Sequence, residues 1–156
     1  MSVDLVLYQP DIAQNTGTLL RLGACLDIAV HIIHPTGFPF SRRELKRGGL
    51  DYLDHARIVE HDSYSHFDRW RGEAGRRLVL LTTKSSESAY AFSYRPGDML
   101  MLGRESAGVP EAVAGAADAR IRIPMRAGLR SINVAVAGAM ILGEALRQTH
   151  GYDALA

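Results

Sequence analysis

The sequence predicts an α/β fold in which a mainly parallel sheet carries helices on both faces. Short runs of apolar residues, typical of strands buried on both sides, recur along the 156 residues. Between them lie segments with the spacing of helices, and strands that alternate with helices form parallel sheets. No linker, repeat or low-complexity tract interrupts this pattern, so we expect residues 1–156 to form a single domain.

The first third of the chain predicts two strands and a helix. Asp4–Tyr8 (DLVLY) is a first buried strand, and Ile28–His34 is a second strand that Pro35 ends. We expect Asn15 to cap the helix between them. The apolar residues of this helix are Leu19, Leu20, Leu22 and Leu26.

A Pro/Gly loop over residues 35–40 follows, and Ser41 then provides a cap for a short helix. This helix carries a basic run, which consists of Arg42, Arg43, Lys46 and Arg47. Residues 57–60 predict a third strand and residues 64–72 a helix. The remaining predicted strands are Arg77–Thr83, Asp98–Leu102 and Ala119–Ile123.

The rest of the chain is organised around Ile121–Gln148. Pro124 removes a backbone donor, so the last strand should stop there. A polar, Gly-containing loop leads to Ser131, which we expect to cap the final helix. That helix is apolar on all sides from Val134 to Leu142, which predicts burial against both the core and a partner subunit.

The composition is that of a globular protein, with 47% hydrophobic and 22% charged residues. The apolar runs are too short for a membrane span, and no signal peptide is evident. The single cysteine, Cys25, has apolar neighbours and is expected to be a buried thiol. These features predict a cytoplasmic protein. The net charge of +1 says little about nucleic acid, although only Lys46 and Lys84 of the 18 basic residues are lysines.

Several common functional motifs are missing. The first strand is not followed by GxGxxG, and no GKS or GKT occurs, which argues against an ordinary dinucleotide or P-loop site. No GxSxG supports serine hydrolysis. The six histidines lack metal-ligand spacing, so we expect no metal site.

Four short patterns have both a functional and a purely structural interpretation. Asn15-x-Gly17-x-x-x-Arg21 is either a helix cap with a surface arginine or a site in which Gly17 leaves room beside Arg21. The loop from Gly103 to Pro110 is either a plain connection or a ligand loop, whose two glycines allow close backbone approach. Ile123-Pro-Met125 with Ser131 and Asn133 is either a capped helix start or part of a site. The basic run is either solvated or contacts an RNA backbone.

The order of these motifs is more specific than any of them alone. NxGxxxR, then G-x-E-x-x-G-x-P, then IPM with S-x-N at the last helix resembles the three motifs of SPOUT-class RNA 2′-O-ribose methyltransferases. The opening DLVLYQPDIAQNTG, the RGGLDY of residues 47–52 and the LTTK of residues 81–84 are most similar to one branch. That branch comprises the minimal bacterial tRNA (cytidine/uridine wobble) 2′-O-methyltransferases, which lack an added RNA-binding domain.

The resemblance covers nearly the whole chain and implies a deep trefoil-knotted α/β fold, an obligate homodimer and an S-adenosyl-L-methionine pocket inside the knot. Knots are rare, and periodicity would not reveal one. The implied cofactor-binding residues are Leu81, Thr82, Gly103, Gly108, Ile123, Met125 and Ser131. The implied catalytic residues are Arg21, Glu105, Ser131 and Asn133, with Arg21 reaching the pocket of the partner subunit.

The implied reaction is 2′-O-methylation of the wobble nucleotide (position 34) in the tRNA anticodon loop. Expected RNA contacts are Asn15, Arg21 and the basic run of Arg42, Arg43, Lys46 and Arg47. Guanidinium is always charged in proteins, so Arg21 suits a phosphate clamp or a stabiliser of the developing alkoxide better than a general base. Glu105 or water is then left to accept the proton.

The chain departs from the family at two positions, both expected near the dimer and substrate side. Val136 replaces a frequent second asparagine, and Gly143 replaces a frequent aromatic residue. Three alternatives remain open: methylation of another RNA such as ribosomal RNA, a non-catalytic RNA-binding module of the same fold, and an unrelated α/β nucleotide binder.

Overall fold

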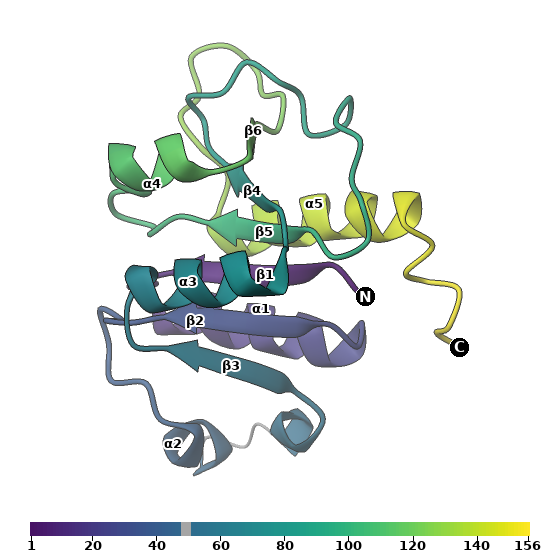
Figure 1. The fold of residues 1–156 in the computed structure, drawn as a ribbon. Helices are drawn as coiled ribbons and strands as arrows, with labels where there is room; N and C mark the ends of the chain where they lie inside the picture. The colour runs from purple at the N-terminus through teal and green to yellow at the C-terminus, as the bar shows by residue number, and fades with distance from the viewer. Residues whose placement is uncertain (48–50) are drawn as a thin grey trace.

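The computed structural model describes residues 1–47 and 51–156, without the side chains of Lys46, Arg47 and Asp51. Within this part of the chain six parallel strands form one sheet in the order β3-β2-β1-β5-β4-β6 (Figure 1). The strands are β1 (Asp4–Tyr8), β2 (Ala29–Ile33), β3 (Arg57–His61), β4 (Leu78–Leu81), β5 (Met99–Leu102) and β6 (Ala119–Ile121). The predicted parallel sheet is therefore confirmed.

Helices cover both faces of the sheet, as predicted (Figure 1). The helices are α1 (Ala13–Cys25), α2 (Arg42–Arg47), the short 3₁₀ helix η1 (Asp51–Asp54), α3 (Tyr64–Ala74), α4 (Glu111–Ala116) and α5 (Val134–Gln148). Helices α1 and α5 pack side by side on one face, and α3 and α4 contribute to a second apolar cluster on the other. Along β1, Leu5 and Leu7 face the cluster beneath α1 and α5, whereas Val6 and Tyr8 face the cluster on the other side of the sheet. Successive residues of this strand are therefore all apolar.

The predicted strands and helices lie where the sequence placed them, with ends that differ by a few residues. Helices α4 and η1 are additions that the sequence analysis did not predict. The prediction of a buried Cys25 is wrong, because this residue is exposed at the end of α1. Cys25 lies one turn after the exposed Arg21, so the face of the helix, rather than the apolar neighbours in sequence, decides its exposure.

Helix α5 is buried along one side and exposed along the other. The closest contact on the buried side involves Gly138, where an added Cβ would lie 2.7 Å from Leu102 Cδ1 of β5. The missing side chain thus brings α5 close to the sheet. On the opposite side Val136 and Met140 retain 51% and 37% of their accessible surface. The second buried side that the apolar sequence predicts is therefore left open in a single chain.

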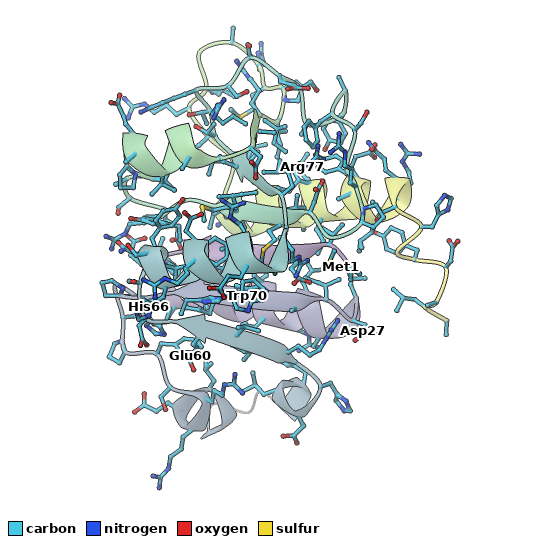
Figure 2. The ribbon with its side chains drawn as sticks, in the orientation of Figure 1. Met1, Asp27, Glu60, His66, Trp70 and Arg77 are labelled. Carbon is cyan, nitrogen blue, oxygen red and sulfur yellow. The ribbon has the colours of Figure 1, made fainter. Side chains whose placement is uncertain are left out.

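A polar cluster lies beneath α3, on the face of the sheet away from α1 and α5. Asp4 accepts hydrogen bonds from Arg76 at 2.6 Å and from His31 Nε2 at 3.1 Å. His31 Nδ1 lies 2.9 Å from His61 Nε2. The centre of the Trp70 ring, which α3 carries (Figure 2), lies 5.0 Å from that of His31 and 5.4 Å from that of His61. Strands β1, β2 and β3 are therefore cross-linked by side chains as well as by their backbone.

No helix in the described residues is long and apolar enough to cross a membrane. The trefoil knot that the family resemblance implies stays a prediction, because strand order alone does not test it.

Candidate functional site

A cavity of about 880 Å³ opens where β4, β5 and β6 end and where α1 and α5 begin. Its walls come from residues 80–84 after β4, 102–109 after β5 and 120–125 around β6. Helix α4 and the starts of α5 and α1 complete it. Ligands of open α/β sheets bind outside the carboxyl ends of the strands, where the strand order reverses, and this cavity occupies such a place. Its size suits a nucleotide-sized molecule.

The loop after β5 closes on itself through two glycines. Arg104 N donates to Gly108 O, and Gly108 N donates to Arg104 O, both at 2.9 Å. A Cβ on Gly103 would lie 2.7 Å from Gly108 Cα, and Gly108 has a φ of +64°, a conformation that favours glycine. Glycine is therefore needed at both positions to close the loop, whereas the approach of this backbone to a ligand stays a prediction.

Glu105, in the same loop, caps helix α1 from a distance. Its carboxylate accepts hydrogen bonds from Asp11 N, Ile12 N and Asn15 Nδ2, each at 3.2 Å. The expected cap of this helix by Asn15 is wrong: α1 begins at Ala13, so Asn15 lies within its first turn, and Ile12 at the N-cap supplies no side-chain bond. A carboxylate at this end also complements the helix dipole.

Asn15 in turn connects the start of α1 to the start of α5. Asn133 Nδ2 donates to Asn15 Oδ1 at 3.1 Å, while Asn133 Oδ1 accepts from Ala135 N and Val136 N. Asn133 is therefore the N-cap of α5, and the prediction that Ser131 caps it is wrong. Ser131, two residues earlier, lines the cavity and does not cap the helix.

Every residue predicted to bind the cofactor lines this one cavity, as do Asn15, Glu105 and Asn133. These residues are Leu81, Thr82, Gly103, Gly108, Ile123, Met125 and Ser131. The partly buried Leu81 and Met125 and the buried Ile123 provide an apolar surface that suits a flat heterocycle.

Arg21 is not part of that cavity. It lies on the exposed side of α1, and its guanidinium carbon is 5.5 Å from the centre of the Tyr52 ring. The space beside Gly17 is open, because a Cβ there would meet no atom within 4 Å, and Arg21 contacts Tyr52 instead. Of the four predicted catalytic residues, three therefore line the cavity and Arg21 lies elsewhere.

The basic run on α2 lies apart from the cavity. Ser41 caps this helix as expected, accepting from Glu44 N at 3.3 Å. Arg42 is engaged with the protein itself, because it donates to Ile58 O and lies 3.9 Å from Glu60. Arg43 is exposed, and the side chains of Lys46 and Arg47 lie outside the described part of the chain.

The sequence analysis did not assign several charged residues that surround the cavity. Lys84, Arg104 and Arg122 line it, and they give its mouth a basic character. Lys84 stood in the LTTK motif, but its position beside the loop after β5 depends on strand order. Asp11 accepts a hydrogen bond from Ser106 and lies 3.6 Å from Arg104. Burial raises the pKa of Asp11, but hydrogen bonding with Ser106 and Glu105, followed by the charge of Arg104, outweighs this effect and lowers the pKa overall.

The described residues contain no group of three or more His, Cys, Asp or Glu side chains arranged to hold a metal ion.

Comparisons with known proteins place this geometry in a family. The model of the SpoU rRNA Methylase family matches residues 2–143. The chain is 59% identical over 144 residues to the tRNA (cytidine(34)-2'-O)-methyltransferase of Beijerinckia indica subsp. indica, covering 92% of this chain and 90% of that one. It is 40% identical over 148 residues to the enzyme of the same name from Escherichia coli K12, covering 94% and 93%.

Solved structures agree with these matches. A structure concerned with the 2-OH methylation of C/U34 on tRNA superimposes with a TM-score of 0.86 at 40% identity, covering 94% of this chain and 95% of that chain. An AdoMet-bound rRNA methyltransferase from Sinorhizobium meliloti superimposes with a TM-score of 0.82 at 27% identity, covering 94% of this chain and 56% of that chain. By fold, site geometry and sequence, the chain belongs to the SpoU rRNA Methylase family.

Proposed function

We propose that this protein is an S-adenosylmethionine-dependent methyltransferase that acts on the 2′-oxygen of the wobble nucleotide (cytidine or uridine 34) of tRNA, and that it works as a homodimer. The observation that carries the proposal is that all the predicted cofactor residues line one cavity at the carboxyl ends of the strands. Relatives that share most of the length of this chain are tRNA (cytidine(34)-2'-O)-methyltransferases.

The cavity fits the cofactor in size and in chemistry. Leu81, Ile123 and Met125 would hold the adenine, and the Gly103–Gly108 loop would approach the rest of the molecule through its backbone. When bound, S-adenosylmethionine supplies a methyl group on a positively charged sulfur. The residues that line the cavity would direct that methyl group toward the ribose 2′-oxygen, whose proton would leave to water.

The protein side of the reaction is mainly positioning. Glu105 already accepts three hydrogen bonds from the start of α1, so we assign it to holding the Gly103–Gly108 loop against that helix rather than to proton removal. Ser131 faces the cavity with its hydroxyl available to the substrate ribose. Lys84, Arg104 and Arg122 at the mouth attract the phosphates of an RNA.

Arg21 completes the site only if it comes from a second copy of the chain. It lies on the exposed side of α1, and the neighbouring helix α5 exposes Val136 and Met140. A second copy that covers this face would bury the apolar residues and bring its own Arg21 to the cavity. In that position a planar guanidinium binds a phosphate or stabilises the developing alkoxide.

The direct test is methyl transfer from labelled S-adenosylmethionine to tRNA of a strain that lacks the gene. We expect a labelled 2′-O-methyl-nucleoside at the wobble position with the wild type, and a rate lower by about a hundredfold or more, still measurable in a single turnover, with Arg21→Ala. Label in ribosomal RNA instead of tRNA would move the proposal to that substrate. Cofactor binding without any methyl transfer would favour a non-catalytic RNA-binding module.

The shared site has a separate test by subunit mixing. Arg21→Ala has an intact cavity, whereas Gly103→Val blocks the cavity and keeps Arg21. Random mixing of the two impaired variants should restore about a quarter of the wild-type active sites, because only mixed dimers hold one complete site. No recovery from a mixture that contains mixed dimers would show that Arg21 acts on its own subunit.

Cytoplasmic location and the absence of a bound metal stay predictions of the sequence.

A further inference from the structure

The side chain of Arg21 contacts the aromatic ring of Tyr52 rather than a carboxylate. Within the described residues it makes no hydrogen bond or ion pair, and its guanidinium carbon lies 5.5 Å from the centre of the Tyr52 ring. An exposed arginine without a partner occupies many rotamers, and each must be given up when the side chain engages a ligand. The contact with Tyr52 restricts those rotamers before any ligand arrives.

Tyr52 is itself fixed to the helix that carries Arg21. Its hydroxyl donates a hydrogen bond to Gly17 O at 3.0 Å, and Gly17 lies one turn before Arg21 on α1. A carbonyl oxygen has two lone pairs, so this bond leaves the helical hydrogen bond of Gly17 intact. Burial raises the pKa of Tyr52, an effect that the charge of Arg21 reduces without cancelling, so the phenol remains protonated and able to donate.

The ring therefore extends from η1 to α1 and ends under the guanidinium. η1 and α1 are in contact, so the position of the ring is determined by backbone on both sides. The guanidinium carbon lies over the ring, and the described residues give its N–H groups no hydrogen-bond partner. That arrangement leaves them available for the two oxygens of a phosphate or for a ribose oxygen.

We propose that Tyr52 is a positioning residue for the methyl-transfer reaction, which holds Arg21 in the orientation that engages the tRNA. The inference rests on the proposed function of Arg21. It extends that function, because a residue outside the cavity would fix the orientation of the Arg21 side chain. It also gives a physical role to the last residue of the RGGLDY segment, which composition and spacing did not explain.

The test is a double-mutant cycle on tRNA methylation, measured under single-turnover conditions with Tyr52→Leu and Tyr52→Phe, each with Arg21 and with Arg21→Ala. Tyr52→Leu should lower kcat/KM for tRNA about two- to five-fold, the range of a cation–π contact at an exposed site. Tyr52→Phe keeps the ring and loses the hydrogen bond to Gly17 O, so its kcat/KM should lie between those of Tyr52→Leu and the wild type. In the Arg21→Ala background Tyr52→Leu should cause no further loss.

Two controls separate this role from a general loss of structure. The affinity for S-adenosylmethionine should be unchanged in Tyr52→Leu, because Tyr52 does not line the cavity. Tyr90→Leu removes an equally large, exposed ring elsewhere and should leave the tRNA rate unchanged. If Tyr52→Leu lowered the rate equally with and without Arg21, or did not lower it at all, the positioning role would be wrong.

The same double-mutant cycle, measured by urea unfolding, distinguishes a failure of the proposed function of Arg21 from a failure of the positioning role of Tyr52. The contact predicts a stabilising coupling between Tyr52 and Arg21 whether or not the protein methylates tRNA. A coupling in unfolding with full activity of Arg21→Ala would overturn the proposed function of Arg21. A strongly impaired Arg21→Ala without coupling in either measurement would overturn the role of Tyr52 alone.

Discussion

The side-chain amide of Asn133 donates a hydrogen bond to Asn15 Oδ1 at 3.1 Å and joins two helix starts that are 118 residues apart in the sequence. Asn15 then donates to Glu105 at 3.2 Å, so a single polar chain links α5, α1 and the loop after β5. All three residues line the cavity. Glu105 and Asn133, which were predicted to be catalytic, and Asn15, which was predicted to contact RNA, thus hold together three segments of the site.

The first prediction distinguishes the capping role of Asn133 from the role of Ser131 in methyl transfer. Asn133→Ala removes the cap of α5 and the bond to Asn15, so it should lower the free energy of unfolding by about 1–2 kcal/mol. Ser131→Ala should leave stability unchanged within about 0.5 kcal/mol and reduce methyl transfer. Urea unfolding beside a single-turnover assay would measure both. Equal destabilisation by the two variants would show that Ser131 shares the capping role.

Glu105→Gln tests whether the carboxylate positions or accepts a proton. The amide presents only one oxygen to three donors, so we expect a loss of about 1–2 kcal/mol in the free energy of unfolding. Glu111→Gln is the matched control, since Glu111 lines the same cavity without a described hydrogen bond.

The activity of Glu105→Gln provides the second half of this test. If the role is positioning, turnover should fall while the shape of the pH–rate profile stays the same. Loss of the acidic limb of that profile would identify Glu105 as the proton acceptor instead.

Gly103→Ala tests the closed loop after β5. The added Cβ would lie 2.7 Å from Gly108 Cα and 2.8 Å from Gly108 C, which are backbone atoms that move only with the loop. Overpacking of this kind costs about 1–3 kcal/mol, so the affinity for S-adenosylmethionine should fall about tenfold or more. Titration calorimetry would measure it. Gly115→Ala, which lines the same cavity with open space around it, should bind the cofactor normally.

The sequence predicted the sheet and most of its elements because each strand is a short apolar run and each buried helix side has a regular spacing. The order of the strands was not predictable in the same way, since it depends on packing between distant segments. The capping residues show the difference clearly. Ser131 and Asn15 are good caps by residue type, but Asn133 and the remote Glu105 occupy those places in the structure.

The candidate site was predicted from motif order, and the residues predicted to bind the cofactor do meet in one cavity. What the motifs left out is the geometry around Arg21. Its distance from the cavity and its contact with Tyr52 both depend on which side of α1 faces solvent. Gly138 is a similar case, because the need for glycine comes from Leu102 on β5 and not from its neighbours in sequence.

The last prediction concerns the polar cluster beneath α3. Burial, followed by the neighbouring His31, lowers the pKa of His61 to about 4 from its ordinary value of 6.5. The groups that face it are His31 from β2, Trp70 and His66 from α3, and the adjacent Asp62. Between pH 4 and 6.5 the unfolded chain therefore binds more protons at this residue than the folded protein does.

Stability should consequently rise with pH through that window and be fully present above about pH 6.5. For His61 alone, the free energy of unfolding should fall by about 2 kcal/mol between pH 7.5 and pH 5. His61→Gln retains a hydrogen-bond donor for His31 and does not titrate, so it should lose that much less than the wild type over the same interval. His150→Gln, at a largely exposed position, should behave like the wild type. Urea unfolding at the two pH values would measure these changes. An equal loss of unfolding free energy in the wild type and in His61→Gln would contradict the lowered pKa of His61.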